Sequence, residues 1–300
     1  VPVLMVTAKK KLCRLLGAGE VPSVSAEDAS EQSLADFGIA SITQLVGAGA
    51  PDIYDPAISH YAMRIGLMAH RACGGLGLLY VSLTDRVQHA VPPGHPLSDT
   101  FYRDFDRLLG EYLEEGFNVG ITADHGMNDK HGGYGSANIL FLEEILRNRG
   151  IYDANVILPI ADPYIRHHGA LGSFAWVYLP HEQAEIARST LSKLDGVEEV
   201  YDRHEASVIY QHPADRIGTL SVSSDAATAL GTSPSRHDLS RLHGPQRSHG
   251  GRHEQPVPIL TSLPLTGHWE TCHRSGAARN RDIHDLLLNG TACSRVLSPK

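Results

Sequence analysis

The sequence has no long hydrophobic run and few cysteines. No apolar stretch approaches the roughly 18 residues that a membrane-spanning helix needs, and no signal-peptide pattern opens the chain. We therefore expect no membrane partner. The 4 cysteines are widely spaced and form no Cys-x-x-Cys pair, which is typical of reduced thiols rather than of a disulfide framework. These absences predict a cytoplasmic protein.

Clusters of basic residues are also missing. The formal net charge is −8 at pH 7, and no run or stripe of Lys and Arg stands out, which argues against nucleic acid as a partner. A chain of 300 residues with 42% hydrophobic residues can bury a large core, or a core with a subdomain. The 18 histidines are many for this length, so a single histidine carries little weight.

The first part of the chain alternates between strand-like and helix-like segments. This alternation predicts an α/β fold in which a mostly parallel sheet is flanked by helices. A polar, acidic stretch at residues 21–36 has weak patterning and is expected to be irregular. The expected strands are residues 3–6, 78–83 and 117–122, and the expected helices are residues 8–16, 56–71 and 101–115.

The middle of the chain loses this rhythm after Gly132 and predicts a small α+β insertion. A long polar loop at residues 233–254 then leads to an expected edge strand at residues 256–260. Within the insertion, strands are expected at residues 155–161, 173–179, 197–201 and 217–222, and a helix at residues 181–194.

Three polar motifs carry the candidate chemistry. One expected buried strand is followed by Asp124 and His125, and another by Asp85 and His89; the third motif is Arg-Ser-His-Gly-Gly around His249. The carboxyl ends of parallel strands face the crevice where α/β sheets bind ligands. If a helix begins at Asp85, its spacing puts Asp85 and His89 on one face. Aspartate and histidine are both ligands for a zinc-like metal.

Each motif alone also has an ordinary structural explanation. Asp85 could cap a helix with His89 solvated, and Asp124 with His125 could form a turn at a strand end. The glycines that follow His249 suit any loop. The three motifs together favour a metal-dependent hydrolase with two metal ions.

These motifs resemble the alkaline phosphatase superfamily and, within it, the phosphonoacetate hydrolase family. The Asp-His-Gly at residues 124–126 is shared across the superfamily. Asp-Pro-Tyr at residues 162–164 and His-His-Gly-Ala-Leu-Gly-Ser at residues 167–173 are more specific. The resemblance extends over nearly the whole chain. It implies an alkaline-phosphatase-like core of residues 1–130 and 245–300, with a small α+β cap of residues 131–244.

The resemblance also implies two Zn²⁺ ions, for which Mn²⁺ or Fe²⁺ could substitute. Asp85, His89 and His249 would hold one ion, and Asp124 and His125 the second. In the family, a further Asp ligand and a nucleophilic Thr lie in an amino-terminal segment that this sequence does not contain. No catalytic nucleophile is therefore assigned in this chain.

Four further side chains are implied as substrate ligands: Lys9, Lys11, Arg166 and His168. Taken without the resemblance, the two lysines read as a solvated helix face and Arg166 as a surface cation. The resemblance has them bind the oxygens of phosphonoacetate, a small anionic substrate that needs permanent positive charges around it. The implied reaction is hydrolysis of its C–P bond to acetate and phosphate.

Two other functions remain open from the sequence. One is a different reaction of the superfamily, that of a phosphodiesterase or a phosphomutase. The other is a non-catalytic fragment that binds metal or an anion. A homodimer is compatible with the sequence.

Overall fold

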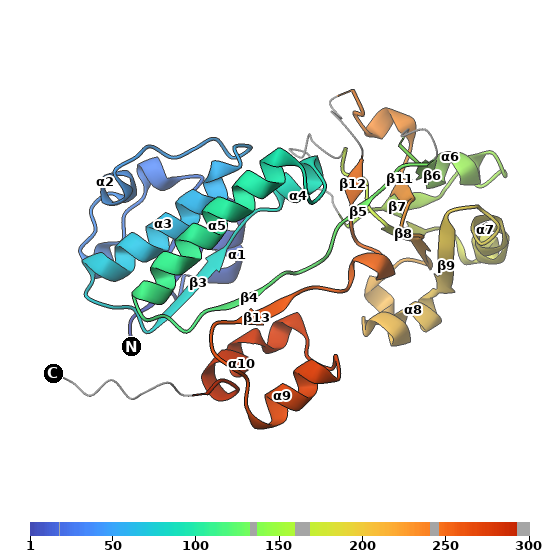
Figure 1. Ribbon diagram of the computed structural model, residues 1–300. Helices are drawn as coiled ribbons and strands as arrows, with labels where there is room; N and C mark the ends of the chain where they lie inside the picture. Colours follow the sequence, from blue (N-terminus) through green and yellow to red (C-terminus); the bar gives the residue numbers. More distant parts are fainter. Residues whose placement is uncertain (18, 133–136, 160–168, 241–245, 293–300) are drawn as a thin grey trace.

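The computed structural model describes residues 1–17, 19–132, 137–159, 169–240 and 246–292. Its amino-terminal part is a parallel sheet with flanking helices, as Figure 1 shows. Strand β1 (Val3–Thr7) is central, with β2 (Ser23–Ser25) and β3 (Leu78–Ser82) parallel to it on either side. The predicted α/β fold class is confirmed.

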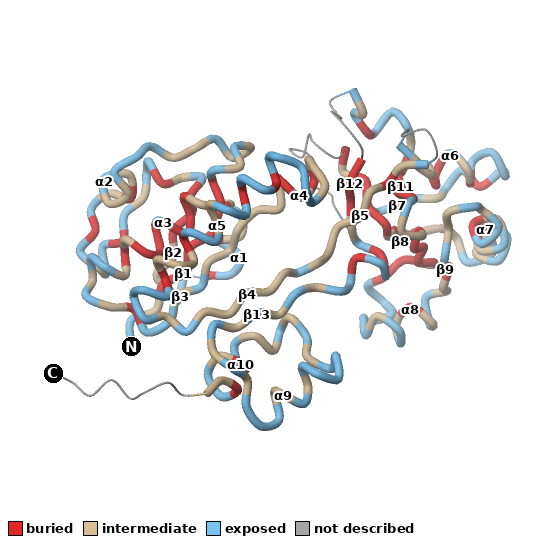
Figure 2. Tube along the Cα trace, in the orientation of Figure 1, coloured by how far each residue is buried: buried red, intermediate tan, exposed pale blue. Residues whose placement is uncertain are grey.

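Helices cover both faces of this sheet because strand side chains alternate in direction. Leu4 and Val6 of β1 join the core cluster that contains Ile58 and Ile65 of α3 (Ala57–Ala72), while Met5 points toward α1 (Lys10–Gly17). Helix α5 (Pro96–Glu114) packs beside α3, and the short α2 (Ile42–Val46) also lies against α3. Figure 2 shows the buried residues concentrated along β1 and α3.

Two expectations about this part are wrong. The stretch at residues 21–36 was expected to be irregular, but it contains β2, whose backbone pairs with the buried strand β1. Helix α5 begins at Pro96 rather than at residue 101, because the His95 side chain accepts a hydrogen bond from Leu97 N and proline suits the first turn of a helix.

Strand β4 also differs from its prediction. It comprises only Gly120–Thr122, is half-buried, and pairs antiparallel with β13 (Ile259–Thr261); among the described residues it does not pair with β3. The preceding Phe117 packs its ring edge-to-face against Tyr112 of α5, with ring centroids 5.3 Å apart. Because β4 pairs with β13, the parallel sheet ends at β3, and the two-stranded β4–β13 ladder runs separately (Figure 1).

The region expected to be the cap, residues 131–244, contains a separate antiparallel sheet with the strand order β7-β8-β10-β9. An apolar cluster of its own, distinct from the cluster under β1, holds this sheet against its helices. The strands are β7 (Asn155–Ile157), β8 (Phe174–Tyr178), β9 (Val197–Asp202) and β10 (Leu220–Ser224), and the helices are α6 (Leu142–Arg147), α7 (Ala184–Leu191) and α8 (Arg203–Tyr210).

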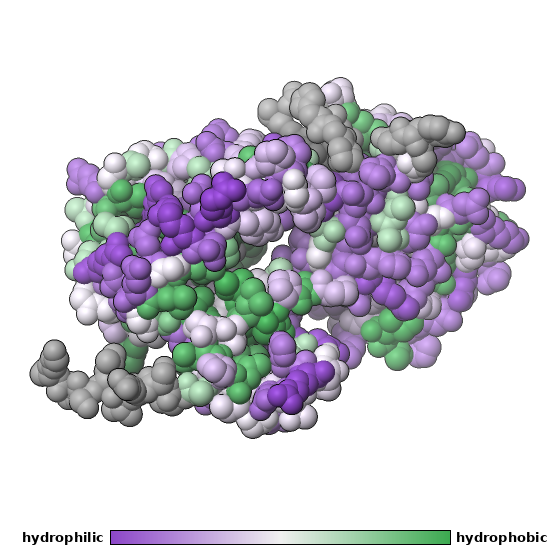
Figure 3. All heavy atoms as spheres, in the orientation of Figure 1, coloured by the Kyte–Doolittle hydropathy of each residue, from purple (hydrophilic) through white to green (hydrophobic). Residues whose placement is uncertain are grey.

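Two short ladders lie near the boundaries of residues 131–244, one just outside this region and one within it. Strand β5 (Asn128–Asp129) pairs antiparallel with β12 (Arg247–Ser248), and β6 (Ile139–Phe141) pairs parallel with β11 (Ala229–Gly231). After β13 the chain forms α9 (Gly267–Arg274) and α10 (Ile283–Asn289). Figure 3 shows apolar residues gathered where β4 and β13 run, whereas the cap region is mostly hydrophilic on that face. Within the described ranges, no helix is both long and apolar enough to cross a membrane.

Candidate metal centre

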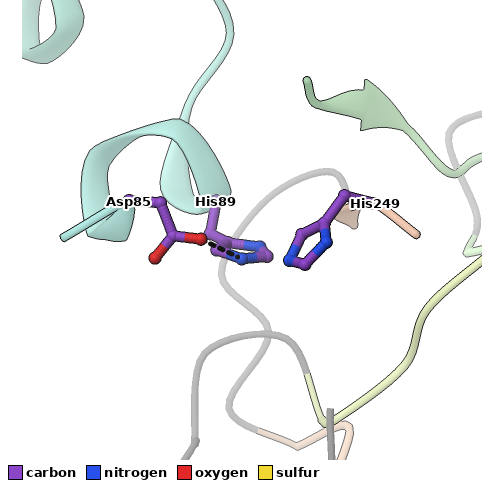
Figure 4. A group of neighbouring side chains, drawn as sticks. All are labelled: Asp85, His89 and His249. Atoms are coloured by element: carbon purple, nitrogen blue, oxygen red, sulfur yellow. Dashed lines mark ion pairs between the residues drawn. The ribbon is translucent and has the colours of Figure 1, made fainter. Parts of the chain in front are cut away.

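One turn of helix places the first two predicted ligands together. Asp85 precedes α4 (Arg86–Ala90) as its N-cap residue, so the spacing of four brings His89 onto the same face. The Nε2 atom of His89 lies 3.1 Å from Oδ2 of Asp85, and the His89 side chain is buried. His249 reaches the same point from the loop after β12 (Figure 4). One ligand atom from each of these three residues lies within 4.8 Å of the others.

His125 lies against this group. Its ring stacks on that of His249, with centroids 3.4 Å apart and an interplanar angle of 7°. Its Nε2 atom lies 3.7 Å from Oδ2 of Asp85 and 3.6 Å from Oδ1 of Asp124. The Asp124 side chain is 88% exposed, so it forms the open edge of the cluster. The structure thus brings together all five residues that the sequence suggested as metal ligands.

Two of the imidazoles have their ring orientation fixed by backbone carbonyls. Nδ1 of His89 lies 3.0 Å from the carbonyl oxygen of Arg247, and Nδ1 of His125 lies 2.9 Å from that of Gly126. A carbonyl oxygen only accepts, so each Nδ1 donates and, in a neutral ring, Nε2 carries a lone pair. Each lone pair then points toward the cluster, as metal-ligating histidines do.

This arrangement fits a metal cation. In the neutral tautomer, Nε2 of His89 and the Asp85 carboxylate are both acceptors, yet they lie 3.1 Å apart. Two acceptors at that distance repel unless a proton or a metal ion lies between them. One carboxylate with two imidazoles is also a common donor set for zinc that leaves a position open for water or substrate.

The electrostatics set the protonation of two ligands. Burial alone would raise the pKa of Asp85, but its contact with His89 and the positive charge of Lys9 hold that pKa well below its usual range. Burial lowers the pKa of His249 to about 3, and repulsion from His125 and His89 acts in the same direction. At neutral pH the Asp85 carboxylate is therefore ionised and the His249 ring neutral, which are the forms that bind metal.

Arg247 joins the segments that carry these ligands, a role that the sequence did not indicate. Its backbone oxygen accepts the His89 hydrogen bond, and its Nε donates to the carbonyl oxygen of Gln88 at 2.7 Å. Its guanidinium forms an ion pair with Asp129 of β5. Because the side chain is buried, these contacts fix α4, β5 and the His249 loop relative to one another. The only signal in the sequence was the position of this residue two places before His249.

The predicted substrate ligands are only partly described. Lys9 follows β1 and is half-buried, and its positive charge helps to lower the pKa of Asp85. Lys11 is exposed in the first turn of α1. Lys10, between them, forms an ion pair with Asp28. Arg166 and His168 lie outside the described residues, so their assignment stays a prediction.

Comparisons with known proteins agree with this fold and centre. The family model described as type I phosphodiesterase / nucleotide pyrophosphatase matches residues 66–252. The phosphonoacetate hydrolase from Sinorhizobium meliloti 1021, solved with phosphonoformate, is 38% identical, with 97% of this chain and 71% of that chain covered and a TM-score of 0.85. The same enzyme solved with phosphonoacetate gives 37% identity with the same coverage and TM-score.

A more distant structure shares the fold alone. An inactive form of murine ectonucleotide pyrophosphatase / phosphodiesterase 5, in complex with AMP, is 13% identical, with 98% of this chain and 69% of that chain covered and a TM-score of 0.51. Fold, centre and family model together define the class as the type I phosphodiesterase / nucleotide pyrophosphatase group of the metal-dependent alkaline phosphatase superfamily. Within that class, this chain belongs to the phosphonoacetate hydrolase family. The family resemblance and the hydrolase class expected from the sequence are thereby confirmed.

Proposed function

We propose that this chain hydrolyses the C–P bond of phosphonoacetate to acetate and phosphate in a zinc-dependent reaction. The observation that carries the proposal is the convergence of Asp85, His89 and His249, with His125 stacked beside them, from segments far apart in sequence. The family relative that was solved with phosphonoacetate supports the choice of a small anionic substrate.

In this proposal Asp85, His89 and His249 hold one zinc ion, and Asp124 with His125 holds a second. Bound zinc would supply Lewis acidity to the phosphonate oxygens. The backbone carbonyls of Arg247 and Gly126 hold the two donating imidazoles in the tautomer that leaves Nε2 for the ion. The exposed Asp124 carboxylate leaves this side of the centre open to solvent, where a substrate can enter.

The four expected substrate ligands would bind the carboxylate and phosphonate oxygens of the substrate. C–P cleavage leaves negative charge on the acetate carbon, which spreads into the carboxylate as an enolate-like species. Positive side chains aimed at that carboxylate stabilise the charge where it develops. We assign these contacts with the substrate to Lys9 and Lys11, together with Arg166 and His168 of the cap.

We further propose that residues 1–130 and 245–300 form the metal-binding core and residues 131–244 the cap. Two observations support this division. The apolar cluster under β1 and the cluster of the β7-β8-β10-β9 sheet are separate. All five candidate metal ligands lie outside residues 131–244.

The direct test measures phosphate released from phosphonoacetate by the purified chain, extended by its natural upstream sequence if the gene encodes one, because the family's nucleophilic Thr is expected there. We expect release that a chelator abolishes and added zinc restores. Asp124→Ala and His125→Ala should lose this activity, whereas His284→Ala, an exposed histidine on α10, should keep it. Retained activity in the first two variants would contradict the proposal.

The description of the matching family model favours a second candidate, hydrolysis of a phosphodiester. The two candidates separate when phosphonoacetate and an aryl phosphodiester are offered to the same zinc-loaded protein. Turnover of the diester but not of phosphonoacetate would indicate that the chain is a phosphodiesterase rather than a C–P hydrolase. Stoichiometric anion binding with no turnover of either compound would indicate a non-catalytic binding protein.

A further inference from the structure

A fully buried ion pair lies next to the candidate metal centre without belonging to it. Nζ of Lys130 is 2.8 Å from Oε1 of Glu254, and the two side chains are 0% and 1% exposed. Buried charges are costly unless they are paired and hydrogen-bonded. Neither residue is a ligand or substrate contact in the proposed reaction, so the pair needs a separate explanation.

The hydrogen bonds of the pair are nearly complete. Lys130 Nζ also donates to the carbonyl oxygen of Ala226 at 2.9 Å. Oε1 of Glu254 accepts a second bond from Nδ2 of Asn128 at 2.8 Å, and Oε2 accepts from Gly251 N at 2.9 Å. These contacts lower the pKa of Glu254 despite its burial, so the carboxylate stays ionised.

The contacts of Glu254 reach the immediate neighbours of two candidate ligands. Its backbone oxygen accepts from the N–H of Gly126, the residue after His125. A side chain at Gly126 would meet the Glu254 backbone oxygen at 3.2 Å, so only glycine allows this close approach without displacement. Gly251, bound by the Glu254 carboxylate, follows His249 by two residues.

The pair therefore joins three parts of the molecule. Lys130 ends the segment that begins with Asp124 and His125, Glu254 ends the loop that carries His249, and Ala226 belongs to the cap region. We propose that Lys130 and Glu254 are positioning residues for the metal centre, which hold the His125 segment against the His249 loop so that the two rings stay stacked. This inference rests on the proposed metal-dependent function.

Stability alone does not account for such a pair. Replacing both members of a buried ion pair by neutral residues of similar size is often neutral or stabilising, whereas removing one member is strongly destabilising. A double replacement therefore removes the ionic contact while sparing the fold. If the pair holds the His125 segment against the His249 loop, the double variant should fold and yet bind metal poorly.

The test uses the full chain carrying Lys130→Met together with Glu254→Gln. Zinc affinity is measured by competition with a chelator, below the unfolding temperature, and the Co²⁺ absorption spectrum reports the ligand geometry. We expect zinc binding about 10- to 100-fold weaker than in the wild type, the size seen when outer contacts of a metal site are removed, and an altered Co²⁺ spectrum.

A matched control is Glu143→Gln. Glu143 is also a buried carboxylate that accepts from a backbone N–H, that of Val156 at 3.0 Å, but it lies in the cap region. It should keep wild-type zinc affinity. A folded double variant with wild-type zinc affinity and an unchanged Co²⁺ spectrum would overturn the inference.

If the double variant does not fold, the single variant Glu254→Gln is used to test the inference. The amide keeps an oxygen for Lys130 but places an N–H₂ group where Oε2 accepted from Gly251. Weaker zinc binding in this variant supports the inference, and unchanged binding overturns it. If the wild-type chain binds no zinc, both the proposed function and this inference are overturned. If wild type and variant bind zinc with equal affinity, only the inference is overturned.

Discussion

The two pairs of candidate ligands are held in different ways. Asp85 and His89 are fixed by one turn of α4, and His89 is buried against the Arg247 backbone. Asp124 and His125 are adjacent in a segment between two short ladders, and Asp124 points into solvent. The helical pair is set by local geometry, while the second pair depends on distant residues that hold its segment in place. We therefore expect the first pair to dominate metal affinity and the second to be more easily disturbed.

The largest effect, a loss of zinc affinity, is expected from His89→Ala. It removes one of the three converging ligands and leaves Asp85 without its partner, so zinc affinity should fall by more than about 100-fold, beyond the loss from an outer contact. Chelator competition on the folded variant measures this, with His284→Ala on α10 as the control. A His89→Ala variant that binds zinc as tightly as the wild type would remove the helical pair from the site.

A smaller effect on folding is expected from Arg247→Met. The carbonyl oxygen of Gln88 loses a charged donor, and Asp129 loses its ion pair. We expect the free energy of unfolding to fall by about 2 kcal/mol, mainly from the buried hydrogen bond, because Asp129 is partly exposed. Urea unfolding measures the change.

The control for this prediction is Arg252→Met. Arg252 also forms an ion pair, with Glu199, but its side chain is exposed. Its loss should lower the free energy of unfolding by at most about 0.5 kcal/mol. Equal losses in the two variants would contradict the linking role of Arg247.

Asp124→Asn should leave the fold almost untouched. The side chain is 88% exposed, so the free energy of unfolding should change by less than about 0.5 kcal/mol. The zinc content per chain should nevertheless fall, because the second pair loses its carboxylate. Elemental analysis of the zinc-loaded variant measures this, and an unchanged zinc content would show that Asp124 holds no ion.

A further effect concerns the acid sensitivity of the metal-free protein. The pKa of His249 is lowered to about 3 in the folded chain, so the unfolded chain binds more protons between that value and its own, near 6.5. Stability due to this group is thus complete above pH 6.5 and is lost as the pH falls toward 3. In His249→Gln the free energy of unfolding should fall less steeply over that range. Equal slopes in variant and wild type would show that His249 is not buried as described.

The local parts of the site were predictable from the sequence. The spacing of four already placed Asp85 beside His89 on one face of a helix, and the Asp85 side chain faces His89 rather than capping α4. Local signals were also overlooked. Helix α8 has a capping box between Asp202 and Glu205, a pattern that is present in the sequence and that predicts a helix start.

Long-range contacts could not be predicted in this way. The pairing of β4 with β13 and the Lys130–Glu254 ion pair join residues that are far apart in the chain, the latter 124 positions apart. No periodicity in either segment specifies its partner, because each choice depends on how the whole chain packs. Strand β2 was missed for a related reason: three residues, two of them serine, form a strand because β1 supplies the backbone partners.

The central claim is that three residues from separate segments share one metal ion. Anomalous diffraction at the zinc absorption edge, from crystals of this chain grown with zinc, tests it most directly. We predict a strong peak bounded by Asp85 Oδ2, His89 Nε2 and the His249 ring, with a second peak beside Asp124 and His125. Fully loaded crystals with zinc bound elsewhere, and none between Asp85, His89 and His249, would contradict the account.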